Sequence, residues 1–196
     1  MFSKRNLLLA SASLWAAATF SVASAQPPST DPQVKLSTSM GAIVLQLDPA
    51  KAPQTVANFL EYVKSGHFDG TVFHRVIDGF MIQGGGFDAS MKEKPTRAPI
   101  KLEAGNGLKN DPYTIAMART GAPHSATAQF FINVANNAML NAPNPDGHGY
   151  AVFGKVIEGR EVVDTIRAVK TGSRGMHQNV PLTPVTIQSA QIISAP

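Results

Sequence analysis

An arginine with unusual neighbours is the first candidate for chemistry in this sequence. Arg75 stands in the run Phe73-His74-Arg75-Val76-Ile77, whose apolar and β-branched residues favour a strand. Because alternate residues of a strand share a face, we expect Phe73, Arg75 and Ile77 to point the same way, and a lone guanidinium among apolar groups is costly. Either a carboxylate pairs with Arg75, or the guanidinium serves as a fixed cationic donor, and spacing alone favours neither.

Two further segments mix apolar residues with amides. Gly79-Phe80-Met81-Ile82-Gln83-Gly84-Gly85 follows the arginine, and Gln129-Phe130-Phe131 comes later. A core strand explains the phenylalanines well, but it explains Gln83 and Gln129 less well.

Other catalytic chemistries lack their residues here. The sequence has no cysteine, which excludes catalytic thiols, zinc knuckles and iron–sulfur ligation. Gly84-Gly85-Gly86 lacks the continuation of a phosphate-binding loop, so we interpret it as a turn or a close backbone approach. The five histidines lack metal-site spacing, no glutamate completes a calcium loop near Asp146, and no Gly-x-Ser-x-Gly indicates a hydrolase. We expect no metal and no cofactor.

The first 25 residues are typical of a cleavable export signal. Lys4 and Arg5 precede an apolar run at 7–20, and Ala23-Ser24-Ala25 provides the small residues of a cleavage site. A retained membrane anchor is the alternative, but the run is shorter than the roughly 20 apolar residues that span a bilayer. We expect cleavage before Gln26 and no membrane attachment afterwards.

The charge of the remaining chain is nearly balanced. The whole chain has 17 basic and 13 acidic residues, and removal of residues 1–25 leaves 15 against 13, a net charge of +2. Glu93 and loop-forming residues interrupt the densest basic run, at 92–101, so we interpret it as a solvated loop and expect no nucleic-acid binding. A length of 196 residues with 43% hydrophobic composition fits one compact domain, for which a monomer is the default expectation.

Strands dominate the elements that must position these groups. Apolar alternation predicts a hairpin over 34–47 with its turn at Ser39-Met40-Gly41, and further strands at 71–77, 80–83, 114–118, 129–134, 151–156 and 185–193. Apolar spacing predicts helices from Pro53 to Gly66 and over 158–169. Since strands and helices do not alternate regularly, we predict a mainly β fold, a closed antiparallel barrel with two helices. We expect residues 26–32 to form a flexible leader, and the long loops at 88–112 and 135–149 could each wall a groove.

Several motifs resemble, in order, signatures of the cyclophilin family of peptidyl-prolyl cis–trans isomerases. They are Phe-His-Arg-Val-Ile at 73–77, Gly-Phe-Met-Ile-Gln-Gly-Gly at 79–85, Met-Ala-Arg-Thr at 117–120, Gln-Phe-Phe-Ile at 129–132 and Val-Phe-Gly-Lys-Val at 152–156. The resemblance covers about residues 33–193 and implies an eight-stranded antiparallel barrel capped by two α-helices. With its signal peptide, the chain is most similar to the bacterial periplasmic members, which implies a periplasmic location.

The resemblance also implies roles for individual residues. Arg75 matches the catalytic arginine, and the proline pocket is matched by Phe80, Met81, Phe131 and Leu140. Substrate-contacting positions are matched by Gln83, Ala118 and Gln129. Three positions depart from the common pattern: Arg119 replaces a frequent asparagine, Met139 a common tryptophan and Tyr150 a common histidine. All three are kept as substrate contacts, with Arg119 contacting the substrate through its backbone. The methionine at 139 implies weak cyclosporin binding. We expect the nearby His148 on the loop surface.

The implied function is faster rotation of X-Pro bonds in unfolded or looped exported proteins. The barrier of about 18–20 kcal/mol comes from amide resonance, so neither a nucleophile nor a metal is needed. A cationic donor at Arg75, aimed at the proline nitrogen, would stabilise the twisted amide more than either planar form. The alternative is a binding module or holdase that grips proline segments without accelerating their rotation.

Overall fold

The computed structural model describes residues 31–194. The predicted signal peptide at 1–25 and most of the predicted leader at 26–32 lie outside the described residues. Within the described part of the chain, no helix is long and apolar enough to cross a membrane.

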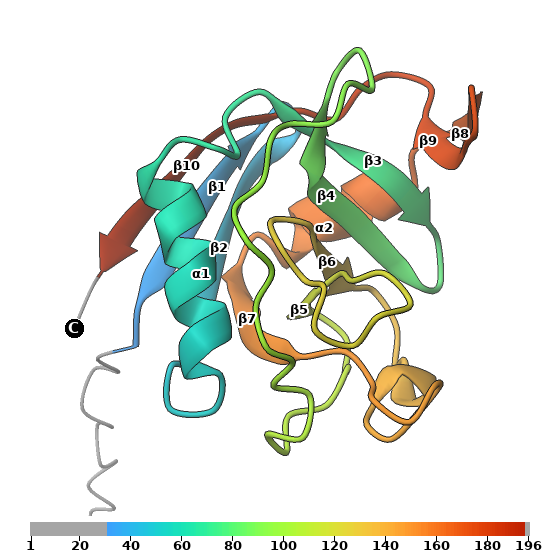
Figure 1. The fold of residues 1–196 in the computed structure, drawn as a ribbon. Coiled ribbons are helices and arrows are strands. Elements are labelled where there is room, and N and C mark those ends of the chain that lie inside the picture. The colour runs from blue at the N-terminus through green and yellow to red at the C-terminus, as the bar shows by residue number, and fades with distance from the viewer. Residues whose placement is uncertain (1–30, 195–196) are drawn as a thin grey trace, which may run out of the picture.

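One antiparallel sheet of eight strands forms most of the molecule, in the order β10-β1-β2-β7-β5-β6-β4-β3 (Figure 1). Its strands are β1 (Gln33–Thr38), β2 (Gly41–Leu47), β3 (Thr71–Ile77), β4 (Met81–Asp88), β5 (Thr114–Met117), β6 (Phe130–Asn133), β7 (Val152–Glu158) and β10 (Ile187–Ser194). A separate hairpin pairs β8 (Thr171–Arg174) with β9 (His177–Pro181) and lies beside β3. The prediction of a mainly β, antiparallel fold is confirmed, including the first hairpin, but β8 and β9 were not predicted.

The prediction of a closed barrel is wrong, because the sheet is open and strongly curled. Its edge strands β3 and β10 form no continuous ladder. A single bridge joins Val72 to Thr186, just before β10, and the Phe73 amide donates to the Val185 carbonyl at 2.9 Å.

Two α-helices flank the curled sheet, as predicted (Figure 1). Helix α1 (Pro53–Lys64) begins with its proline in the first turn, and the Glu103 carboxylate accepts hydrogen bonds from the amides of Gln54 and Thr55 at 3.1 and 2.8 Å. Helix α2 (Arg160–Arg167) is shorter than the predicted 158–169, because β7 continues to Glu158 and Gly159 is left-handed at φ 81°.

The main core lies between α1 and the inner face of the sheet. The ring of Phe59 on α1 contacts those of Phe68, Phe130 and Phe153, with centroids 5.0, 5.6 and 5.2 Å apart. All four side chains are fully buried. This aromatic cluster supports β6 from behind, so the next residue along β6, Phe131, is held on the opposite face of the sheet.

The two long loops behave differently. The loop after β4 is fastened to α1, through Glu103 and through the Arg97 amide, which donates to the Tyr62 hydroxyl at 2.7 Å. The loop after β6 contains the short 3-10 helix η1 (Ala138–Leu140), and Leu140 lines the main cavity described below. We expected that each loop could wall a groove. The loop at 135–149 does so at the main cavity, whereas the loop at 88–112 lines a smaller pocket through Leu108, Lys109 and Asp111.

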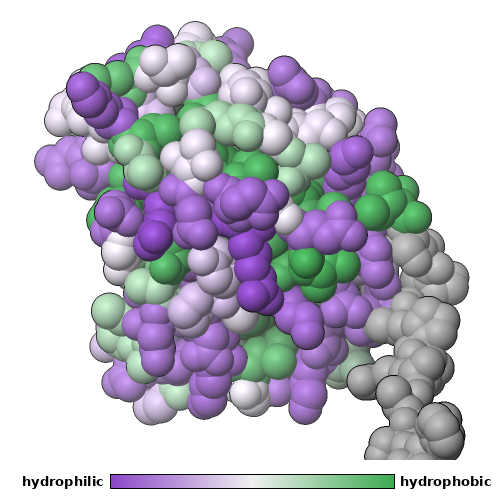
Figure 2. Space-filling view, turned by 180° about the vertical axis from the view of Figure 1, so that it is seen from behind, coloured by the Kyte–Doolittle hydropathy of each residue, from purple (hydrophilic) through white to green (hydrophobic). Residues whose placement is uncertain are grey.

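The surface seen from behind shows several small hydrophobic areas separated by hydrophilic residues (Figure 2).

Candidate active site

A cavity of about 580 Å³ gathers the residues that the sequence singled out. Its lining includes every predicted site residue except Met139: Arg75, Phe80, Met81, Gln83, Ala118, Arg119, Gln129, Phe131, Leu140 and Tyr150. These residues come from β3, β4, β6, η1 and the segments that flank β4, β5, β6 and β7.

The apolar end of the cavity rests on a second, smaller core cluster. Met81, Phe131 and Leu140 are buried members of this cluster, and Phe80 and Tyr150 pack against it while partly exposed. The rings of Phe131 and Tyr150 meet edge to face with centroids 5.7 Å apart. A hollow lined in this way fits a small apolar ring such as that of proline.

A β-bulge in β3 presents Arg75 to the cavity. Phe73 pairs with Gly84 and Arg75 with Gln83, so two steps along β3 match one step along β4 and His74 is the extra residue. Phe73 therefore lies in the main core, while Arg75 is exposed and Ile77 packs on the cluster under the cavity. The prediction that Phe73 shares a face with Arg75 is wrong, because the bulge breaks the period of two.

The guanidinium of Arg75 has no carboxylate partner among residues 31–194. The ion pairs among these residues involve other arginines and a lysine. The side chain of Arg75 makes one long hydrogen bond, in which its Nη1 donates to Oε1 of Gln83 at 3.5 Å. The sequence left two interpretations of Arg75 open. Within the described chain, the structure excludes the one in which a carboxylate neutralises the guanidinium.

The two glutamines form one hydrogen-bonded unit beside Arg75. Nε2 of Gln83 donates to Oε1 of Gln129 at 2.9 Å, which leaves the Gln83 oxygen directed at Arg75. A Cβ atom at Gly86 would lie 2.6 Å from the Gln129 side chain, so a larger residue there would displace that side chain. The triple glycine is thus a close backbone approach within β4, one of the two interpretations made from the sequence.

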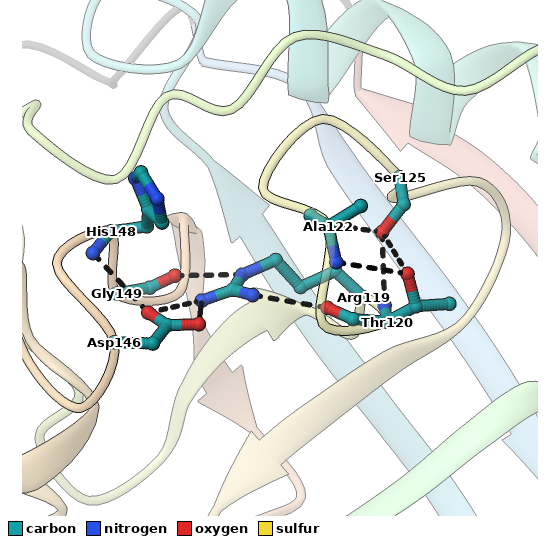
Figure 3. Close-up of polar contacts among 7 residues, drawn as sticks. All are labelled: Arg119, Thr120, Ala122, Ser125, Asp146, His148 and Gly149. Atoms are coloured by element: carbon teal, nitrogen blue, oxygen red, sulfur yellow. Dashed lines mark hydrogen bonds and ion pairs between the residues drawn. The ribbon is translucent and has the colours of Figure 1, made fainter.

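The side chain of Arg119 is fully engaged within the protein (Figure 3). It is only 1% exposed, and its Nη2 donates to both carboxylate oxygens of Asp146 at 2.8 and 2.7 Å. Nε donates to the Gly149 carbonyl at 3.0 Å, and Nη1 to the Thr120 carbonyl at 3.0 Å. This bidentate pair lowers the pKa of the Asp146 carboxyl, chiefly through the hydrogen bond from Arg119.

This arginine clamp, Arg119 with Asp146 and Gly149, also supports the apolar end of the cavity. The guanidinium carbon lies 4.5 Å from the ring centroid of Tyr150, a cation–π contact. Tyr150 in turn contacts Phe131, and its amide donates to the Leu140 carbonyl at 2.9 Å. Because the guanidinium is committed to these contacts, it is not available to a substrate, and the backbone contact at residue 119 stays a prediction.

Two predicted residues lie away from the cavity. Met139 is 56% exposed and does not line it, although the neighbouring Leu140 does. His148 is exposed, as expected, and its amide donates to Asp146 in the clamp.

A buried network of asparagines beneath the site was not predicted. The side chains of Asn110, Asn133 and Asn137 are essentially inaccessible to solvent. Nδ2 of Asn137 donates to the Phe80 carbonyl and to Oδ1 of Asn133, both at 2.7 Å, and Nδ2 of Asn133 donates to Oδ1 of Asn110 at 3.1 Å. The network ties the turn that carries Phe80 to η1. Each asparagine resembles an ordinary loop residue in sequence, so only their spatial convergence reveals it.

The cavity continues past Arg75 to residues that the sequence reading missed: His74, Phe87, Met176, His177, Gln178 and Asn179. Burial, with smaller contributions from the nearby His177 and Arg75, lowers the pKa of His74 to about 4, so the ring is neutral at pH 7. Among residues 31–194, no cluster of three or more acidic or histidine side chains could hold a metal ion.

Comparison with known proteins gives the family. Residues 33–192 match the sequence model of the family described as cyclophilin type peptidyl-prolyl cis-trans isomerase/CLD. The chain therefore belongs to the cyclophilin-type peptidyl-prolyl cis–trans isomerases, which makes it an isomerase by class. The match leaves only the first 32 residues and the last four outside the family region.

Curated bacterial relatives agree. Peptidyl-prolyl cis-trans isomerase cyp18 of Streptomyces antibioticus is 64% identical over 162 residues, which cover 82% of this chain and 98% of the relative. Isomerase A of Dickeya dadantii is 54% identical over 96% of this chain and 98% of its own. Isomerase B of Escherichia coli is 55% identical over 81% of this chain and 98% of its own.

Solved structures support the same fold. A cyclophilin-type isomerase from Cryptosporidium parvum has a TM-score of 0.67 and 27% identity, covering 85% of this chain and 99% of its own. The same isomerase in the presence of the dipeptide Ala-Pro has a TM-score of 0.66 at 27% identity, covering 83% and 99% of the two chains.

Proposed function

We propose that this isomerase accelerates X-Pro rotation in exported polypeptides, with Arg75 stabilising the twisted amide beside an apolar proline pocket. The observation that carries the proposal is the state of Arg75: exposed to the cavity, without a carboxylate partner in the described chain, and adjacent to a buried apolar hollow. The presence of the dipeptide Ala-Pro with a related isomerase supports a proline-containing ligand.

The chemistry follows from the loss of amide resonance. As the X-Pro bond twists, the proline nitrogen regains a lone pair that is absent from both planar forms. A guanidinium N–H donating to that lone pair stabilises the twisted state selectively, and this lowers the barrier. The arginine keeps its charge throughout, so no proton is transferred.

The remaining lining residues would hold the substrate. The pyrrolidine ring fits among Phe80, Met81, Phe131, Leu140 and Tyr150, where burial fixes one side of the rotating bond. Gln83, Gln129 and the backbone at Ala118 and Arg119 provide hydrogen-bonding groups for the preceding peptide. Rotation is then confined to the other side of the bond.

Exchange spectroscopy on an Ala-Pro peptide tests the proposal. We expect rapid cis–trans exchange with the wild-type protein and a fall of roughly a hundredfold in Arg75→Ala, equivalent to about 3 kcal/mol of barrier. The matched control is Arg97→Ala, which removes an exposed guanidinium paired with Glu61 on α1. Exchange that survives in Arg75→Ala at the wild-type rate would exclude the arginine mechanism.

The competing function is a binding module or holdase for proline-containing segments. It predicts tight peptide binding with exchange no faster than in free peptide, in wild type and Arg75→Ala alike. The unpaired Arg75 favours catalysis, because a module that only grips proline has no need of a cation beside the pocket.

The cellular setting is part of the same proposal. Cleavage before Gln26 and a periplasmic location follow from the signal pattern at 1–25, and mass spectrometry of protein from the periplasmic fraction would test both. We expect a monomer by light scattering. Cyclosporin should bind weakly, because an exposed methionine at 139 offers no aromatic surface, and titration calorimetry would measure this affinity.

A further inference from the structure

The β8–β9 hairpin forms a second wall of the catalytic cavity. Met176, His177, Gln178 and Asn179 line the same space as Arg75 and the apolar hollow. The hairpin extends from the main sheet beside β3, the strand that carries Arg75 (Figure 1). A peptide anchored by its proline at the apolar end therefore has a separate surface within reach, since two extended residues advance about 7 Å.

Contacts with β3 and β4 fix this wall in place. The ring of His177 packs against Phe87 with centroids 5.0 Å apart, and Phe87 packs against the buried His74 at 4.7 Å. At the other strand of the hairpin, Nη1 of Arg174 donates to the Ala89 carbonyl at 2.7 Å. The hairpin is thus tied to the end of β4 through both of its strands.

Met176 at the hairpin turn is 99% exposed, the most exposed of the large hydrophobic side chains in the described chain. It follows Gly175, which is left-handed at φ 60°, so the turn projects the methionine from the end of the hairpin. Asn179, two residues after His177, also adopts a positive φ of 57°, uncommon for a residue other than glycine. Methionine is unbranched and polarisable, and can adapt to apolar groups of different shapes.

The charges of the cavity restrict what this wall accepts. Its lining contains no aspartate or glutamate, and Arg75 is exposed to it. A basic side chain would find no carboxylate partner here and would face a like charge. An apolar side chain would instead cover Met176 and the faces of Phe87 and His177.

We propose that Met176, Phe87 and His177 form a flanking subsite that takes an apolar side chain of the substrate, one or two residues from the proline. The proposal rests on the proposed function, because the proline in the apolar hollow fixes the distance to the hairpin. The subsite gives the isomerase a preference among proline segments, favouring apolar over basic flanking residues.

The experiment compares peptides that differ only beside the Ala-Pro unit. Leucine, alanine or lysine is placed one position before the alanine, or one or two positions after the proline, and kcat/KM is measured by exchange spectroscopy. For wild type we expect leucine peptides to exceed alanine peptides at one of the two flanks, and lysine peptides to be the poorest. In Met176→Ala, the leucine-to-alanine ratio should fall about three- to tenfold, mainly through KM.

Two variants make the result specific. Met176→Leu preserves the apolar volume and should keep the leucine preference. Leu182→Ala removes a side chain that is 67% exposed and lies outside the cavity, and should leave the preference as in wild type. Selective labelling of the methionine methyl groups provides a second measurement, in which the Met176 signal should shift on addition of a leucine peptide more than on addition of an alanine peptide.

The outcomes separate this proposal from the proposed function. If Arg75→Ala abolishes exchange while Met176→Ala has the same peptide preference as Leu182→Ala, the flanking subsite is wrong and the isomerase mechanism stands. If the wild-type protein does not accelerate exchange, the proposed function fails first. The subsite is also wrong if the Met176 methyl signal does not shift on addition of any of the peptides.

Discussion

At the scale of single residues, the site depends on two arginines with opposite environments. Arg75 is exposed and has no carboxylate partner within the described chain, so its donors are available to a ligand. Arg119 is buried, and each of its nitrogens donates to a carboxylate or carbonyl oxygen. The sequence marked both positions through the family resemblance. It did not predict the ion pair of Arg119, because Asp146 lies 27 residues away and nothing in its spacing indicates the pair.

The arginine clamp predicts that Asp146→Asn impairs catalysis without touching the substrate. Loss of the carboxylate leaves a buried guanidinium without its counter-ion, so the segment carrying Gly149 and Tyr150 should shift. We expect kcat/KM for an Ala-Pro peptide to fall about tenfold, mainly through KM, and the thermal midpoint to decrease. Glu61→Gln, which removes an exposed carboxylate paired on α1, is the control. An unchanged KM in Asp146→Asn would show that the arginine clamp is not required to hold Tyr150 in its position at the cavity.

At the scale of elements, small irregularities position the site on otherwise regular strands. The bulge at His74 turns Arg75 out of the core face. Gly85 in β4 lets Phe68 and Phe130 approach the backbone, and Gly86 lets Gln129 approach it. Alternation of apolar residues predicted the strands well, because each buries one face against α1 or the smaller cluster. It did not predict the bulge, since periodicity assumes an unbroken register. It also missed β8 and β9, whose residues carry no apolar alternation and are buried only at Val180 and Pro181.

The asparagine network predicts that η1 and the turn carrying Phe80 depend on each other. Asn137→Ala removes the donor to the Phe80 carbonyl and leaves Oδ1 of the buried Asn133 without that hydrogen bond. We expect the free energy of unfolding in urea to decrease by about 2 kcal/mol. Catalytic efficiency should fall as well, because Phe80 and Leu140 line the proline pocket. Asn136→Ala changes the exposed neighbouring asparagine and should be nearly neutral, and a comparable loss in that variant would argue against the network.

At the scale of the whole molecule, the sequence predicted the main elements along the chain but not the closure of the sheet, which depends on long-range contacts. The positions of the eight strands of the main sheet and of both helices along the chain agree with the sequence expectation. The edges at β3 and β10 meet at the bridge between Val72 and Thr186 and form no continuous ladder among the described residues. Strand patterns describe the faces of a sheet and carry little information about whether its edges meet. The hairpin that occupies the space beside β3 is therefore also the part of the cavity wall that the sequence did not predict.

Acid sensitivity of the whole fold should follow from the buried His74. Its pKa in the folded protein is about 4, below the usual value near 6.5, mainly because burial disfavours the charged ring. Between these two pH values the unfolded chain binds a proton that the folded chain does not, so stability present above pH 6.5 is lost as the pH falls toward 4. From pH 7 to 4.5 we expect His74 to account for a loss of about 2 kcal/mol in the free energy of unfolding. Urea unfolding of wild type and His74→Gln at these pH values measures it as the difference between the two slopes. His148→Gln, at an exposed histidine, should retain the wild-type slope, and a His74→Gln protein that loses stability as steeply as wild type would place the titrating group elsewhere.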